Sequence, residues 1–167
     1  MKSVVALAGG VGGAKLALGF SYILGSDELT IVVNTADDDR FYGLHVSPDL
    51  DTVMYTLAGL SNSEMGWGLV SESFRTLERL KEYGVDAWFN LGDLDLATHL
   101  YRTKMLDEGK TLSEVCQQLA KSLGVEHKIL PVTDSSIKTV LETQDGVMSF
   151  QEYFVKNQCE PVVKSID

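Results

Sequence analysis

The sequence predicts an α/β fold of the Rossmann-like, doubly wound kind, with a mostly parallel sheet and an inserted helical lobe at about residues 60–125. Ser3–Ala8 is a short apolar run, Gly9–Gly13 follows as a glycine-rich turn, and apolar residues then recur at helical spacing over Ala14–Leu24. Thr30–Asn34 is a second β-branched run, so the strands of this unit should be parallel and its crossover right-handed. We expect the first strand to be buried on both faces.

The rest of the chain predicts one more helix beside the sheet, then the helical lobe, then late strands. Thr35–Ser47 is polar and is predicted to be a loop, and Pro48 opens a helix that ends near Gly59. Helical spacing and terminal glycines predict three further helices, the last with a Thr-x-x-Glu capping box, within residues 71–84, 93–109 and 111–124. Strand candidates lie at residues 128–130 and 139–143, and residues 160–167 show no strand-closing pattern.

Length, charge and cysteine content restrict the class of protein. The chain has 167 residues, which suits a single domain over residues 1–167, and its net charge is −10. Such an acidic balance argues against nucleic acid as a partner, because phosphate backbones are bound by clustered Lys and Arg. No run approaches the ~20 apolar residues needed to cross a bilayer. Two cysteines without metal or redox spacing predict reduced thiols, and we therefore expect a cytoplasmic protein without a membrane partner.

The glycine-rich turn is the first candidate for a binding site. Gly10, Val11, Gly12 and Gly13 precede Lys15 at the start of the predicted helix. Glycines let the backbone approach a phosphate closely, and a helix N-terminus offers free N–H groups. The run is not the dinucleotide fingerprint, because Lys15 stands where that pattern needs glycine, and it lacks the Gly-Lys-Ser/Thr ending of a Walker loop. A tight turn without a ligand is the alternative.

Two acidic segments follow where a parallel sheet binds ligands. A run of three aspartates comes after Asn34 at the carboxyl end of the second strand, where Asp37 and Asp38 are the stronger candidates to orient a ligand hydroxyl or Mg²⁺. A solvated surface run is the alternative. Asp49 and Asp51 lie in the first turn of the next helix, where the helix dipole already favours both. They stand about 200° apart around the helix axis, so they cannot share one packing role.

A third acidic segment opens the helix predicted at residues 93–109. Asp93 can cap that helix, and Asp95, His99 and Arg102 follow at spacing i, i+4 and i+7, which places them on one stripe. A solvated ion-pair face is the favoured interpretation of this stripe. His99 could serve in acid–base chemistry only if the stripe faces a cleft.

Together these segments resemble the 2-phospho-L-lactate transferase family of coenzyme F-420 biosynthesis. The most specific pair of blocks is Ser-Pro-Asp-Leu-Asp-Thr at 47–52 and Asp-Leu-Ala-Thr-His at 95–99. Further blocks follow the family's order at residues 7–15, 33–38, 42–58, 66–68, 91–93, 130–134 and 150–152. The resemblance spans essentially the whole chain but about half of the family's length, so we expect an incomplete fragment of the full fold. Leu94 departs from the basic residue that the family often has there.

The resemblance implies a transferase. Its donor would be a guanosine diphosphate adduct of lactate, enolpyruvate or a similar acid, and its acceptor the ribityl hydroxyl of 7,8-didemethyl-8-hydroxy-5-deazariboflavin, with release of GMP. It also implies that Asp51 and Asn90 contact this deazaflavin acceptor, and that the protein forms a homodimer. Attack on a diphosphate requires neutralisation of its charge, and a protein of net charge −10 would need Mg²⁺ for this purpose.

The expected site combines these assignments. Asp51 and Asp49 are assigned to catalysis, and Asp37 and Asp49 to the metal. The residues assigned to ligand binding are Gly10, Val11, Gly12, Gly13, Lys15, Asn34, Asp51, Asn90 and Asp93. Three rival hypotheses stand beside this one: a regulatory protein of the related group that binds nucleotide or sugar nucleotide without turnover, a nicotinamide-dependent oxidoreductase, and an inactive fragment. The intact 47–52 block disfavours the first, and the imperfect glycine fingerprint disfavours the second.

Overall fold

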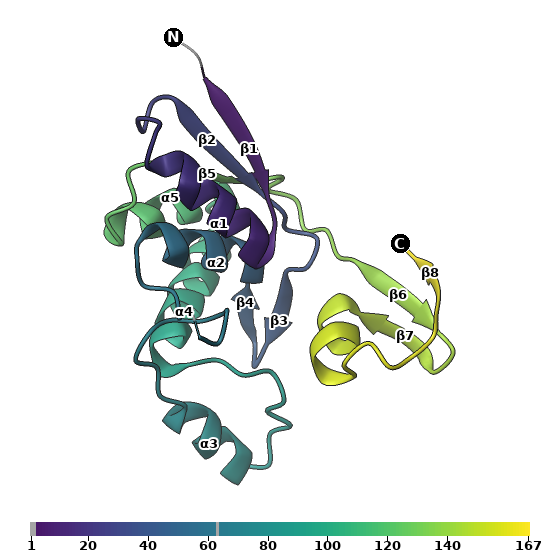
Figure 1. The fold of residues 1–167 in the computed structure, drawn as a ribbon. Helices are drawn as coiled ribbons and strands as arrows, with labels where there is room; N and C mark the ends of the chain where they lie inside the picture. The colour runs from purple at the N-terminus through teal and green to yellow at the C-terminus, as the bar shows by residue number, and fades with distance from the viewer. Residues whose placement is uncertain (1–2, 63) are drawn as a thin grey trace.

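The main sheet of the computed structural model, which describes residues 3–62 and 64–167, is parallel (Figure 1). Its strands are β1 (Val4–Ala8), β2 (Leu29–Val33) and β5 (Lys128–Pro131), in the order β1–β2–β5. Helix α1 (Gly10–Ser21) connects β1 to β2, and these two strands pair in parallel. The predicted parallel strand–helix–strand unit is therefore confirmed, as is the α/β fold class.

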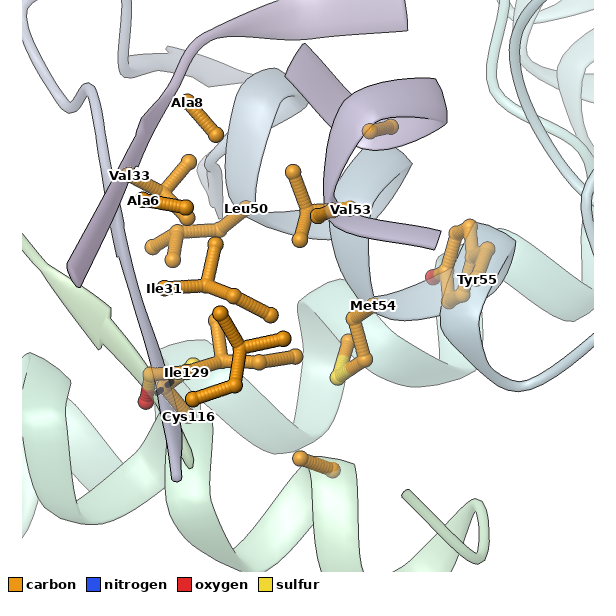
Figure 2. Close-up of a cluster of buried hydrophobic side chains, with 14 of the residues drawn as sticks. Ala6, Ala8, Ile31, Val33, Leu50, Val53, Met54, Tyr55, Cys116 and Ile129 are labelled. Atoms are coloured by element: carbon orange, nitrogen blue, oxygen red, sulfur yellow. Dashed lines mark hydrogen bonds between the residues drawn. The ribbon is translucent and has the colours of Figure 1, made fainter. Parts of the chain in front are cut away.

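The core lies on one face of this sheet. Figure 2 shows Ile31 of β2 and Ile129 of β5 together with Leu50 of helix α2 (Pro48–Leu57), all of them buried. Val5 and Leu7 of β1 alternate with the buried alanines of that strand and are 63% and 77% exposed. The expectation that β1 is buried on both faces is therefore wrong for this chain. The helices that pack on the sheet cover one of its faces, and the residues of that face and of the helices form a single core cluster.

The glycine run is helical. Helix α1 begins at Gly10, so the residues predicted as a turn form its first turn. A Cβ atom on Gly13 would lie 2.9 Å from the Cα atom of Ala8, which shows how closely the helix approaches β1. Glycine disfavours helix by about 1 kcal/mol per residue relative to alanine, which is why the sequence pattern predicts a later start. Close packing on the strand outweighs this local preference.

The predicted loop at residues 35–47 contains a hairpin. Strands β3 (Asp39–Phe41) and β4 (Leu44–Val46) pair antiparallel around Tyr42 and Gly43, whose φ angles are 54° and 82°. Positive φ at both turn residues suits a two-residue hairpin, but a Tyr-Gly turn lacks the usual Asn or Asp signal. Helix α2 (Pro48–Leu57) follows as predicted, with Pro48 at its first position.

The three later helices also lie within their predicted ranges. They are α3 (Arg75–Glu82), α4 (Asp93–Asp107) and α5 (Leu112–Ser122), and the predicted capping box is formed by Thr111 and Glu114. Helix α5 contributes three side chains to the main core, whereas α3 lies far from the sheet in Figure 1. Among the residues that the structure describes, none of the helices is long and apolar enough to span a membrane.

The last residues form a second, antiparallel sheet. Its order is β7 (Gly146–Ser149), β6 (Val140–Thr143) and β8 (Val163–Ile166), with a short π-helix, η1 (Glu152–Lys156), before β8. Residues 160–167, which show no strand-closing pattern in the sequence, nevertheless contain β8, because β6 provides a partner for this segment. A backbone hydrogen bond from Thr139 to Ala36 joins this sheet to the loop after β2.

Replacement of Gly13 by alanine should destabilise the fold by about 1–3 kcal/mol, because the new methyl group meets the backbone of Ala8. Gly12→Ala is the matched control, since nothing lies within 4 Å of a Cβ atom there and alanine favours helix. Urea unfolding of both variants measures the difference. Equal stability of the two variants would contradict the packing role of Gly13.

Candidate active site

A cavity of about 470 Å³ lies beside the carboxyl ends of β1 and β2. Part of its lining is polar and comes from the starts of α1 and α2 and from the loop after β2: Gly10, Asp37, Asp49 and Asp51. Another part is aromatic and comes from the segments before α3 and α4 and from the region of η1: Trp67, Phe89, Phe150 and Phe154. The cavity therefore joins an acidic end to an aromatic lining.

Asp37 and Asp49 are brought together by one amide group. The Asn34 side-chain amide donates to Asp37 Oδ2 at 2.9 Å and to Asp49 Oδ2 at 3.0 Å. Burial, and to a smaller extent the charge of Asp49, raise the pKa of Asp37 against the opposing effect of hydrogen bonds from Thr139 and Asn34. Within the described part of the chain, neither carboxylate has an ion-pair partner. Two negative charges thus share one neutral donor.

The first turn of α1 lies against the carboxylate of Asp49. Cβ atoms on Gly9 and Gly10 would each lie 3.3 Å from a carboxylate oxygen of Asp49, so glycine leaves room for this approach. Val11 lines the cavity beside Gly10, whereas the other residues of the predicted phosphate-binding turn do not. Gly12 and Lys15 are exposed outside the cavity lining, and Gly13 is packed on β1.

Asp51 faces α4 and belongs to a buried network. Arg102 Nη1 donates to Asp51 Oδ2 at 3.0 Å, and Nη2 donates to the other carboxylate oxygen. Arg102 Nη1 also lies 3.2 Å from His99 Nδ1, His99 Nε2 lies 3.3 Å from Asp95 Oδ1, and Tyr55 donates to that oxygen at 2.7 Å. Asp95, His99 and Arg102 are buried, so the interpretation of their stripe as a solvated face is wrong.

The electrostatics of this network follow from its burial. Burial opposes the charge of Arg102, but the adjacent carboxylate of Asp51 raises the pKa of the guanidinium above its usual value. Burial also opposes the charge of Asp95, while its contact with His99, the hydrogen bond from Tyr55 and the charge of Arg102 hold the pKa of Asp95 below its usual value. Asp51, Asp95 and His99 each offer a ligand atom within 4.8 Å of the others, so this group could hold a metal ion.

Behind the cavity, a buried pair fixes the start of α2. Ser47 donates to Asp38 Oδ2 at 2.7 Å, and His45 Nε2 lies 3.7 Å from the same oxygen. Burial raises the pKa of Asp38 to about 7 and lowers the pKa of His45 to about 4, so burial disfavours the charged form of each side chain. Asp38, a candidate ligand in the sequence, therefore supports the helix that carries Asp49 and Asp51.

Asp93 caps a different helix from the one predicted. Its carboxylate accepts hydrogen bonds from Ser73 Oγ at 2.5 Å and from the backbone N–H of Thr76 at 3.0 Å, at the start of α3. The start of α4 is capped by Glu72, which accepts from two of its backbone N–H groups. Asp93 does not line the cavity, whereas Asn90 does.

A parallel α/β sheet with a cavity at the carboxyl ends of its strands, beside a helix N-terminus, has the architecture of Rossmann-like proteins. The family model described as 2-phospho-L-lactate transferase CofD matches residues 4–167, and the chain belongs to this family.

Two relatives agree with this assignment, and a solved structure agrees with the fold. The 2-phospho-L-lactate transferase of Methanosarcina mazei is 38% identical over 164 residues, which cover 98% of this chain and 54% of that protein. The phosphoenolpyruvate transferase of Kitasatospora aureofaciens is 45% identical over 92% of this chain and 50% of that protein. A crystal structure of a UPF0052 family protein from Bacillus halodurans shares the fold, with a TM-score of 0.57 and 20% identity over 99% of this chain and 50% of that one. The chain spans about half the length of these relatives.

Asp93→Ala should lower the melting temperature at neutral pH and leave ligand binding in the cavity unchanged. Hydrogen bonds from Ser73 and Thr76 lower the pKa of Asp93 from 3.8 to about 2, so its stabilising contribution is complete above pH 3.8 and is lost as the pH falls to about 2. Melting curves of wild type and variant should therefore converge across that interval. Asp107→Asn, at an exposed carboxylate, is the control. A constant difference at all pH values would contradict the capping role.

Proposed function

We propose that this chain carries the acceptor and metal sites of a phosphoester-group transferase. The group transferred would be of phospholactyl or phosphoenolpyruvyl type, and it would pass from a guanosine diphosphate adduct to the ribityl hydroxyl of 7,8-didemethyl-8-hydroxy-5-deazariboflavin, with release of GMP. The observation that carries the proposal is that Asp37, Asp49, Asp51 and Asn90 line one cavity together with aromatic side chains. The names of the two kinds of relatives support either three-carbon group.

The aromatic lining suits the flat ring of the acceptor. Phe154 and Trp67 line the cavity and are 56% and 37% exposed, although aromatic side chains are usually covered. Phe150 stacks on Phe154, with ring centroids 5.5 Å apart. A planar heteroaromatic ligand would cover these faces, and Asn90 would meet its polar groups. At the acidic end, the carboxylate of Asp51 would take or orient the proton of the attacking hydroxyl.

The pair Asp37 and Asp49 fits a magnesium ion. The two carboxylates share the amide of Asn34 and lack a cationic partner among the described residues, so a divalent cation would balance their charge. Mg²⁺ prefers oxygen ligands, whereas the group around His99 contains a nitrogen ligand and already holds a guanidinium. Bound there, the ion would neutralise charge on the diphosphate. The N–H groups at the start of α1 would contact the same phosphates.

Homodimer formation, which the resemblance to the family implies, stays a prediction.

Turnover can be tested directly by mass spectrometry. This chain, beside a version extended to the length of its relatives, is incubated with the deazaflavin, the guanosine diphosphate-linked donor and Mg²⁺. We expect the phosphoester of the deazaflavin and GMP, and we expect Asp51→Asn to lower the rate by about 100-fold or more. Asp107→Asn, at an exposed carboxylate of α4, should keep the wild-type rate. Nucleotide binding without any product would instead support the regulatory hypothesis, and near-normal turnover by Asp51→Asn would remove that residue from catalysis.

The metal assignment can be tested with Mn²⁺ as a paramagnetic replacement for Mg²⁺. Asp49→Asn should weaken Mn²⁺ binding about tenfold or more, because it removes a charged ligand. Asp95→Asn changes a carboxylate of the second acidic group and should leave the affinity unchanged. Titrations followed by electron paramagnetic resonance measure both. The opposite result would place the ion between Asp51, Asp95 and His99.

A further inference from the structure

We propose that Arg102 is a positioning residue, which fixes the carboxylate of Asp51 toward the acceptor hydroxyl and is itself held by His99, Asp95 and Tyr55. The role of Asp51 in this inference rests on the proposed function, whereas the contacts of Arg102 do not. The two helices that carry the network meet through it. Asp51 and Tyr55 lie one turn apart on α2, and Asp95, His99 and Arg102 lie on successive turns of α4.

The guanidinium restrains the carboxylate in a way that a simple charge would not. Both terminal nitrogens of Arg102 donate to Asp51, one to each carboxylate oxygen. Such a planar fork fixes the rotation of a carboxylate as well as its position. A lysine ammonium would supply the charge but would leave this rotation free. The orientation of Asp51 at the cavity therefore depends on the planar group of Arg102.

The hydrogen-bond directions define how Arg102 is held. A guanidinium only donates, so His99 Nδ1, 3.2 Å from Arg102 Nη1, accepts with its lone pair. In the neutral imidazole the proton then lies on Nε2, which faces Asp95 Oδ1 at 3.3 Å. Tyr55 donates to the same oxygen at 2.7 Å. Both nitrogens of His99 thus face members of the network, and its Nδ1 helps to orient Arg102.

The two acidic groups of the site differ in whether a positively charged side chain contacts them. Arg102 Nη1 contacts both Asp51 and His99, which are two members of the group that could hold a metal ion. The guanidinium therefore supplies the charge that a cation would supply there. The pair formed by Asp37 and Asp49 has no such partner among the residues described. A metal ion would therefore bind at Asp37 and Asp49, and Asp51 would stay available to the acceptor.

Arg102→Lys tests this role, with Tyr55→Phe as a milder change at the far end of the network. Arg79→Lys is the matched control, because Arg79 forms an exposed ion pair with Glu82 on α3. The intrinsic fluorescence of the deazaflavin reports its binding to the chain. We expect Arg102→Lys to weaken acceptor binding about tenfold or more, the effect of one lost hydrogen bond to a charged group. Tyr55→Phe should have a smaller effect, and the control none.

Two further readouts separate positioning from general stability. Mn²⁺ affinity should be unchanged in Arg102→Lys, and in the extended protein kcat should fall while KM for the donor stays constant.

In ¹⁵N spectra, Arg102 alone among the four arginines should show resolved Nη signals, because its rotation is restricted, and Asp51→Asn should merge them. Circular dichroism establishes which variants fold. If Arg102→Lys unfolds, a loss of acceptor affinity in folded Tyr55→Phe supports the proposal.

The possible failures are distinguishable. Wild-type acceptor binding by folded Arg102→Lys, or by Tyr55→Phe with an unchanged Arg102 signal, overturns the proposal. Freely rotating Nη groups in the wild-type chain overturn it as well. A wild-type chain that binds no deazaflavin contradicts the proposed function instead, and the ¹⁵N spectra then decide by themselves whether Arg102 holds Asp51.

Discussion

The buried ion pair between Asp51 and Arg102 is the interaction on which the candidate site depends. It joins the first turn of α2 to the third turn of α4, two helices that are separated by more than thirty residues of chain. Removal of either partner would leave the other as an uncompensated charge in the interior. Such a change lowers the free energy of unfolding by about 3–5 kcal/mol. The position of α4, and with it one side of the cavity, is therefore tied to the same carboxylate that faces the ligand.

The two groups of carboxylates in the site differ in the partners that contact them. One group of carboxylates, Asp51 and Asp95, lies beside a resident guanidinium and a histidine. The other, Asp37 and Asp49, is bridged only by an amide. In a chain of net charge −10 this contrast has a chemical consequence, since an anionic ligand could approach only where a cation is added. The two groups therefore suit different tasks, orientation in one case and charge neutralisation in the other.

Much of the fold follows from local patterns, and the departures have physical causes. The capping box of Thr111, the helix opened by Pro48 and the parallel unit around α1 all depend on neighbours in the sequence, and each is present. The start of α1 and the exposure of Leu7 depend instead on what packs against β1. Helix propensity and hydrophobicity describe a residue by itself, so they cannot report a close approach to a strand or an uncovered face of a sheet.

The sequence by itself determined that acidic residues and a glycine-rich helix start would meet, because the carboxyl ends of parallel strands share one edge of the sheet. Asp37 and Asp49 were foreseeable neighbours for this reason. Only the tertiary structure decided that the stripe of Asp95, His99 and Arg102 faces inward, since spacing defines a stripe but not the direction in which its helix is rotated. That rotation is set by the packing of α4 against β4 and α5 and by the ion pair of Arg102 with Asp51 on α2, and it converts a surface pattern into the buried support of the site.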